Sequence, residues 1–252
     1  MSPERRSKRA VAVMIAGSML VSAGVVSVVV QSVTHGSGEH IHIDSRSAAL
    51  SATTPPTTAP GPGTVEAASE PGPVVVAIGD SIMDGHNVKS SHAWPQLIGA
   101  ATNWQLTDLA ADGSGFVAVG DDGGTFQDQA VEAVDLNPSI VIIAASSNDL
   151  DEDPDEVASQ TMKTMSYLRD ELPEARIFAL NAFWGDTTPP DELGELDADI
   201  LAASQAVDAD YLDIGQPLAG QPELMQFDDI HPVSKGLTVI AAAVAAAIRE
   251  AG

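Results

Sequence analysis

Residues 74–81 read Val-Val-Val-Ala-Ile-Gly-Asp-Ser, and this stretch decides the class of fold. A short β-branched run that ends at a glycine is typical of a strand buried on both faces, as in a parallel sheet. Residues 140–145, Ile-Val-Ile-Ile-Ala-Ala, repeat the pattern after the turn residues Asn137 and Pro138. The two runs therefore predict neighbouring strands of one parallel sheet.

Helical patterns separate these runs from further candidate strands. Three more strands are expected, at residues 105–110, 176–180 and 209–214. Helices are expected around Trp94 and at residues 126–134, 154–172, within 189–206 and 234–250. Strands that alternate with helices predict an α/β fold, a three-layer α/β/α sandwich with a parallel central sheet of the flavodoxin-like type. In such folds the functional side chains lie beyond the carboxyl ends of the strands.

Composition excludes several classes of protein. The chain has 252 residues with 11 Lys+Arg against 36 Asp+Glu, a formal net charge of −25. This acidic excess argues against a nucleic-acid partner, because a phosphate backbone requires a basic surface. The absence of cysteine excludes disulfides, thiolate metal sites and a cysteine nucleophile. An apolar content of 44 % is too high for a wholly disordered chain.

The N-terminal segment has the pattern of a membrane anchor. Residues 1–9 contain four basic side chains, and residues 10–30 contain no charge. We expect a transmembrane helix or signal-anchor at 10–33, with 1–9 cytoplasmic and the rest extracytoplasmic, as a single-pass protein of the cell membrane. The alternative is a signal peptide cleaved after the small residues at 21–23, which would release a secreted protein.

Residues 34–72 are expected to form a Ser/Thr/Pro-rich linker, because this composition cannot bury enough apolar area to fold. His40, His42 and Asp44 alternate within it and could ligate a metal on a strand face, but no packed scaffold would fix their geometry. We interpret them as a solvated polar patch. Residues 73–252 then form one domain of ordinary size.

Four polar groups follow the predicted strands or lie near the C-terminus. They are Gly79-Asp80-Ser81, residues 110–115, Ser146-Ser147-Asn148-Asp149 and Asp228-Asp229-Ile230-His231. Each alone is ordinary turn or capping chemistry. Together they supply a nucleophilic hydroxyl, a base, an acid to orient the base, and donors for an oxyanion, which are the parts that ester hydrolysis needs.

In these motifs the sequence resembles the SGNH hydrolases, also called the GDSL esterase/lipase family. The first block of that family corresponds to Gly79-Asp80-Ser81-Ile82, the third to residues 146–149, and the fifth to Asp228 and His231. The second-block glycine corresponds to Gly113, with Gly115 as the alternative. Ser146 stands where the family usually has glycine.

The resemblance implies a catalytic triad of Ser81, His231 and Asp228. It also implies an oxyanion hole made by the backbone N–H groups of Ser81 and Gly113 and the side-chain amide of Asn148. No metal and no organic cofactor are expected. The implied function is a membrane-tethered extracytoplasmic serine esterase that acts on acetyl or other short-chain O-acyl esters of small molecules, glycans or lipids. The alternative is a cell-surface binding module that keeps the fold without useful catalysis.

Three other features have ordinary interpretations. His86 and His92 could line the pocket or serve as base, but we interpret them as loop residues near its mouth. The glycine-rich residues 113–124 lack the lysine of a phosphate-binding loop. The acidic residues 151–156 are interpreted as a solvated helix start, with a weak calcium site as the alternative.

Overall fold

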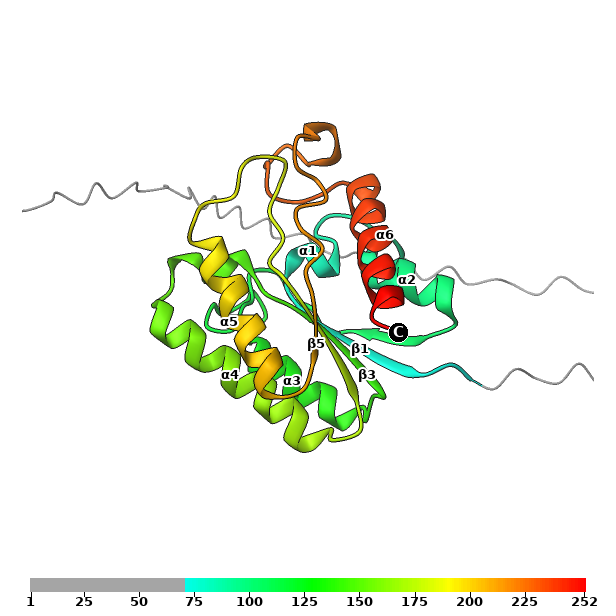
Figure 1. Cartoon of the computed structure of the whole chain (residues 1–252). Helices are drawn as coiled ribbons and strands as arrows, with labels where there is room; N and C mark the ends of the chain where they lie inside the picture. Colours follow the sequence, from blue (N-terminus) through cyan, green and yellow to red (C-terminus); the bar gives the residue numbers. More distant parts are fainter. Residues whose placement is uncertain (1–70) are drawn as a thin grey trace, which may run out of the picture. The chain divides into compact units, whose positions relative to one another are not determined.

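The computed structural model describes residues 71–252 (Figure 1). The basic segment, the transmembrane helix and most of the linker expected from the sequence, together with His40, His42 and Asp44, lie outside these residues. Within residues 71–252, no helix combines the length and the apolar character that crossing a bilayer requires.

A five-stranded parallel sheet forms the middle of the fold. Its strands are β1 (Val74–Ile78), β2 (Gln105–Asp108), β3 (Ile140–Ala144), β4 (Arg176–Leu180) and β5 (Asp210–Leu212), in the spatial order β2-β1-β3-β4-β5. Every neighbouring pair is parallel. The parallel sheet expected from the two apolar runs is confirmed.

Helices cover both faces of the sheet, which confirms the three-layer α/β/α class (Figure 1). One face packs against α3 (Phe126–Asp135), α4 (Pro154–Glu171) and α5 (Leu193–Ala206), and the other against α2 (Trp94–Thr102) and α6 (Ser234–Glu250). Alternate strand residues point to opposite faces, so Val76 and Ile78 join the first layer while Val75 and Ala77 join the second. All four side chains are completely buried.

Local hydrogen bonds set the ends of the elements, and they explain where sequence and structure differ. The strand expected at 105–110 ends at Asp108 because its carboxylate accepts the N–H of Ala110 and turns the chain. Helix α4 begins after Asp153, whose carboxylate caps the N–H groups of Asp155 and Glu156. The acidic start of this helix therefore serves as its N-cap, in agreement with the sequence interpretation.

Four short helices were not expected from the sequence: α1 (Ser81–Asp84), η1 (Ser90–His92), η2 (Ser147–Asp151) and η3 (Pro222–Leu224). Three to five residues are too few for a hydrophobic period to show. Helices α1 and η2 follow β1 and β3, the neighbouring strands between which the order of the sheet changes direction. Such a switch point leaves a crevice at the carboxyl ends of the strands, where an α/β fold places its site.

Candidate active site

Ser81 is the first residue of α1, directly beyond the carboxyl end of β1. Asp80 caps this helix, since its Oδ1 accepts the N–H of Ile82 at 2.9 Å. Burial raises the pKa of Asp80, while hydrogen bonds from Ser146, Ile82 and Met83 and the nearby His231 oppose that rise. The cap fixes the start of α1 and with it the position of the Ser81 hydroxyl.

Ser81, His231 and Asp228 form one continuous line of hydrogen bonds. The Ser81 hydroxyl lies 2.9 Å from His231 Nε2, and His231 Nδ1 lies 2.9 Å from Asp228 Oδ2. A carboxylate only accepts, so Nδ1 carries the ring proton and Nε2 is left to accept from Ser81. The three residues predicted as a triad are brought together from positions up to 150 residues apart.

Asp228 is held by its own loop. Its Oδ1 accepts the backbone N–H groups of Ile230 and His231, each at 3.0 Å, which turns the carboxylate back toward the ring. Slight burial opposes ionisation, but these bonds, the bond from the His231 ring and its charge outweigh it and lower the pKa of Asp228 to about 2. Asp229 is exposed with a φ of 59°, and among the described residues its carboxylate has no hydrogen-bond partner.

Donors for an oxyanion stand around Ser81. The N–H groups of Ser81 and Gly113 have no acceptor within residues 71–252, so both are available to a ligand. Gly113 adopts a φ of 77°, a conformation that suits glycine, and is exposed. The Asn148 amide donates one hydrogen to the Ser114 carbonyl at 3.0 Å, which leaves its second hydrogen unused.

Gly115, the alternative to Gly113, has a different task. Its N–H donates to the Ala118 carbonyl at 2.9 Å. A Cβ at Gly115 would lie 2.5 Å from the Asp149 carboxylate, so glycine is needed here to let two segments pass closely. This geometry favours Gly113 as the oxyanion donor.

Comparison with known proteins agrees with this geometry. The sequence model of the GDSL-like Lipase/Acylhydrolase family matches residues 77–238. The chain belongs to this family. The resemblance noted from the motifs is confirmed, and membership makes the chain a carboxylic ester hydrolase.

One protein is similar to this chain in sequence, and two solved structures are similar to it in fold. This GDSL-family chain is 28 % identical over 191 residues to "GDSL lipase Rv0518" of Mycobacterium tuberculosis, which covers 68 % of this chain and 79 % of that protein. The psychrotrophic esterase EstA from Pseudoalteromonas sp. shares the fold with a TM-score of 0.59 at 14 % identity, over 70 % of this chain and 97 % of that one. A family two carbohydrate esterase from Cellvibrio japonicus gives 0.58 at 15 %, over 71 % and 61 %.

Two buried polar residues support the site of this GDSL-family chain, and no role was predicted for either. The Asp149 carboxylate accepts the consecutive N–H groups of residues 116–118 at 2.8–2.9 Å, which holds the loop that follows Gly113. Burial raises the pKa of Asp149, and the three N–H bonds oppose that rise. Asp149 follows Asn148 in the third motif, which was the available sequence signal.

The other residue is Gln129, buried on α3. Its amide bonds both backbone groups of Gly79, at 2.9 and 3.0 Å, and the Ser114 hydroxyl at 3.0 Å. Gln129 therefore connects the end of β1 to the loop of residues 112–118, which contains Gly113 and is called the oxyanion loop below. A glutamine on a helix gives no sequence signal for this role, because the contact forms only when α3 packs on the sheet.

Of the two other histidines considered from the sequence, His86 contacts the predicted triad and His92 does not. His92 is exposed, and its Nδ1 contacts the Ser234 hydroxyl at 3.1 Å. The His86 ring stacks on the His231 ring with centroids 4.1 Å apart, and its Nδ1 bonds the Asp112 carboxylate. Within the described residues, His231 bonds the Ser81 hydroxyl and His86 does not, so the geometry favours His231 over His86 as the candidate base.

A metal would fit poorly beside the triad. Ligand atoms of His86, Asp228 and His231 lie within 4.8 Å of one another, close enough to hold an ion by distance alone. The two rings are stacked with an angle of 29° between their planes. Nitrogen lone pairs lie in the ring plane, so nearly parallel rings direct them side by side rather than toward one ion.

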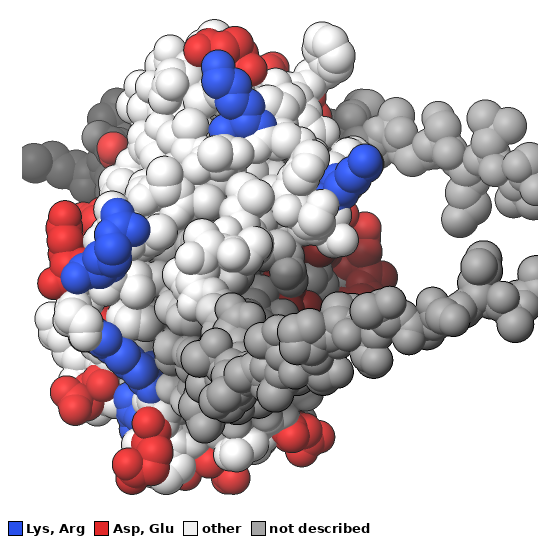
Figure 2. Space-filling view, turned by 90° about the vertical axis from the view of Figure 1, so that its right-hand side faces the viewer, with Lys and Arg blue, Asp and Glu red and all other residues white. Residues whose placement is uncertain are grey.

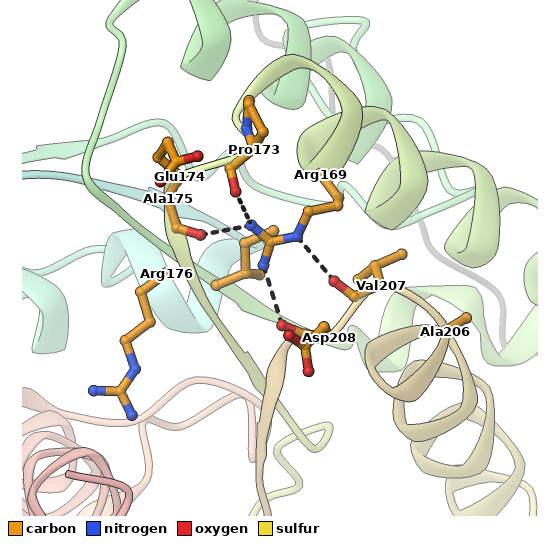
Figure 3. A pocket seen from close by; sticks show the side chains of 9 residues that line it. Arg169, Pro173, Glu174, Ala175, Arg176, Ala206, Val207 and Asp208 are labelled. Carbon is orange, nitrogen blue, oxygen red and sulfur yellow. Dashed lines mark hydrogen bonds between the residues drawn. The ribbon is translucent and has the colours of Figure 1, made fainter.

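A hollow of about 540 Å³ lies at the opposite end of the sheet, and arginine side chains that line it make hydrogen bonds within the protein (Figure 3). Arg169 reaches across it and donates to the backbone carbonyls of Pro173, Ala175, Val207 and Asp208, and at 3.4 Å to that of Leu172. Arg176 bonds the Asp210 carboxylate and the carbonyls of Ala251 and Gly252. Every guanidinium nitrogen of the two arginines donates to a group of the protein, so these side chains hold the surrounding segments together.

Charge is dispersed over the surface. On the face drawn in Figure 2, acidic side chains lie mainly around the edge and basic ones stand at separate points, without a broad basic patch among the described residues.

Proposed function

We propose that this chain is a serine esterase that hydrolyses acetyl and other short-chain O-acyl esters through the triad of Ser81, His231 and Asp228. The observation that carries the proposal is the unbroken line of two 2.9 Å hydrogen bonds from Asp228 through His231 to Ser81. That line matches the requirements of a nucleophile, a base and an orienting acid.

Acylation begins with attack by Ser81 Oγ on the ester carbonyl carbon, while the hydroxyl proton passes to His231 Nε2. Asp228 accepts from the protonated ring and stabilises its charge. The resulting oxyanion is met by the N–H groups of Ser81 and Gly113 and the free amide hydrogen of Asn148. His231 then protonates the departing alkoxide. In the second half, water attacks the acyl-enzyme with His231 as base, and the acid and free Ser81 are released.

The preference for short acyl groups rests on a small pocket beside the triad. Its volume is about 50 Å³, and it is lined by Ile82, Ser147, Phe183, Trp184, Gly185, Asp229 and Ile230. Residues adjacent to Ser81, Asn148 and His231 all contribute to its wall, so it opens next to the reacting atoms. An acetyl methyl group fits a space of this size, and a long acyl chain does not.

The direct test is hydrolysis of p-nitrophenyl acetate by the full-length chain and by its Ser81→Ala variant. We expect the variant to fold and to lose turnover, because no other side chain supplies the bond-forming oxygen. Unchanged turnover, with contaminating esterases excluded, would overturn the nucleophile assignment. Folded wild-type protein that hydrolyses none of a range of acyl esters would favour the non-catalytic binding module.

The alcohol component is proposed to be a glycan. Carbohydrate esterases are among the proteins that share this fold, and the proposal carries their substrate class over to this chain. A screen of O-acetylated glycans for release of acetate tests it. Activity confined to small synthetic esters would contradict a glycan substrate.

The enzyme is further proposed to be tethered to the cell membrane by residues 10–33, with residues 73–252 on the outer side. The support is the charge-free run at 10–30 preceded by four basic residues. The expected result is that full-length protein stays with membranes after salt and carbonate washes. Mature protein that begins at Gly24 and washes off with salt would show that the segment is a cleaved signal.

A further inference from the structure

His86 contacts three of the segments that carry proposed catalytic groups, those of Ser81, Gly113 and His231. Its backbone N–H donates to the Ser81 carbonyl at 2.9 Å. Its ring stacks on the ring of His231, with centroids 4.1 Å apart and 29° between the planes. Its Nδ1–H donates to the carboxylate of Asp112, the residue before Gly113. His86 thus joins these three segments, through its backbone N–H at Ser81 and through its ring at His231 and Asp112.

Gln226 reinforces the link between His86 and the loop of His231. Its side-chain amide donates to the His86 carbonyl at 2.8 Å and to the Pro232 carbonyl at 3.0 Å. Its backbone N–H donates to the His231 carbonyl at 2.7 Å. These three bonds from Gln226 fix the backbone of His86 relative to the backbone around His231. The residues that carry the two stacked rings are therefore held close together.

We propose that His86, oriented by Asp112, is a positioning residue that holds the His231 ring in line with Ser81. This inference rests on the proposed esterase function. Asp112 accepts the Nδ1–H of His86 and so fixes the direction in which the flat ring faces. The His231 side chain is 16 % exposed and is oriented at its edge by Asp228. The His86 ring supplies the contact on its face.

The need for such a contact follows from the geometry of proton transfer. Two hydrogen bonds at the ring edge leave the His231 ring free to tilt about the line that joins its two nitrogens. A second ring against one face restricts that tilt, because a tilted His231 ring would move one edge away from the His86 ring and push the other edge into it. Misplacement by about 1 Å can cost about 100-fold in rate. The contact should therefore affect turnover more than substrate binding.

The test compares three variants of the full-length chain with wild type on one acetyl ester. We expect His86→Ala to lower kcat by about 10- to 100-fold with KM close to wild type. His86→Phe keeps a flat face against His231 and should recover most of the lost kcat. His92→Ala is the matched control, since His92 is exposed and outside the triad, and it should keep wild-type turnover.

A spectroscopic measurement follows the ring itself. The proton shared by His231 Nδ1 and Asp228 should give a low-field NMR resonance in wild type and in His86→Phe, and this resonance should broaden or vanish in His86→Ala. If His86 only stabilised the fold, the turnover of each His86 variant would instead fall in proportion to its folded fraction, which circular dichroism measures.

The proposal is overturned if kcat of His86→Ala stays within twofold of wild type, or if His86→Phe is no better than His86→Ala. If the alanine variant does not fold, His86→Phe and His86→Gln decide: the phenylalanine should be the more active, and the reverse order overturns the role of the ring face. If wild type hydrolyses no ester, the proposed function fails, while the NMR resonance still tests the positioning of His231.

Discussion

Ser146 Oγ donates a hydrogen bond of 2.7 Å to Asp80 Oδ2, and this contact joins the carboxyl ends of β1 and β3. The same hydroxyl accepts the N–H of Asn148 at 3.1 Å, while Asp80 accepts the N–H of Ile82. A side chain that replaces the usual glycine of the family therefore points into the interior, where it connects the cap of α1 to Asn148. Ser146 is 1 % exposed.

Ser146→Ala should destabilise the fold, because it leaves Oδ2 of the buried Asp80 carboxylate without a donor, while Oδ1 keeps the N–H of Ile82. The expected loss is about 1–3 kcal/mol in the free energy of unfolding, measured by urea denaturation. Ser90→Ala provides the control, since Ser90 is exposed and its hydroxyl makes no hydrogen bond among the described residues. Equal stability of the two variants would contradict the structural role of this hydroxyl.

Asp149→Asn should slow catalysis without touching the triad. The amide keeps the shape of the side chain but turns one acceptor into a donor, which then faces a backbone N–H from residues 116–118. The oxyanion loop should loosen, and kcat should fall by up to about 100-fold. Asp151→Asn, at an exposed position four residues after Ser147, is the control. Similar kcat values for both variants would show that the loop does not depend on Asp149.

Sequence patterns predicted the layers of this fold because burial dictates them. The runs at 74–78 and 140–144 are apolar since both faces of the sheet are covered, and the carboxyl ends that they define hold Ser81 and Asn148. The contact between Asp228 and His231 could also be predicted from the sequence, because three residues of separation let the carboxylate reach back to the ring.

The sequence could not predict the role of residues that depend on tertiary contacts. Gln129 acts at the site only because α3 packs beneath β1, and His86 stacks on His231 only because their loops meet 145 residues apart along the chain. Neither contact leaves a period or a spacing in the sequence. The choice between Gly113 and Gly115 likewise required knowing which N–H already had an acceptor.

Asp108 should make stability depend on pH. Burial, with a smaller contribution from the charge of Asp84, raises the pKa of Asp108 to about 7, while the bond from the Ala110 N–H opposes it. The folded chain therefore holds this proton at pH values where the unfolded chain has lost it. Stability should fall as pH rises from about 4 to about 7, because the folded state binds the extra proton there.

The variant Asp108→Asn isolates this effect, since the amide can still accept the N–H of Ala110 and carries no charge. We expect it to be more stable than wild type at about pH 8, with the difference shrinking toward about pH 4. Urea denaturation across this range measures it, and Asp135→Asn, exposed at the end of α3, controls for loss of one negative charge. A difference that does not change with pH would contradict the prediction.

Ile230→Ala should widen the acyl preference. Ile230 lines the pocket of about 50 Å³ and is 58 % exposed at its rim, so truncation opens the wall with little effect on the core. The ratio of kcat/KM for octanoyl over acetyl esters should rise about tenfold or more. Phe227→Ala serves as control, because Phe227 is fully exposed and lines a different groove. Equal ratios in both variants would place the acyl group elsewhere.

The adjacent acids Asp228 and Asp229 give the sharpest test of the triad. Asp228 Oδ2 lies 2.9 Å from His231 Nδ1, and the bonds of its Oδ1 to two backbone N–H groups keep it there. Asp229 adopts a φ of 59° and is exposed. Its carboxylate bonds no group among the described residues. Only Asp228 can therefore fix the tautomer of His231 and stabilise its charge.

Asp228→Asn keeps the size of the side chain but presents an amide that can stabilise the wrong tautomer. The same change cost about ten-thousandfold in kcat in a serine protease, and we expect a loss of up to that size here. Asp229→Asn removes an equal charge one residue away and should lower kcat/KM far less than Asp228→Asn does, because Asp229 lies in the pocket wall but does not bond His231. Both variants are measured on one acetyl ester at neutral pH. If Asp229→Asn is the more damaging, the triad uses Asp229, and the proposed alignment of the fifth motif is wrong by one residue.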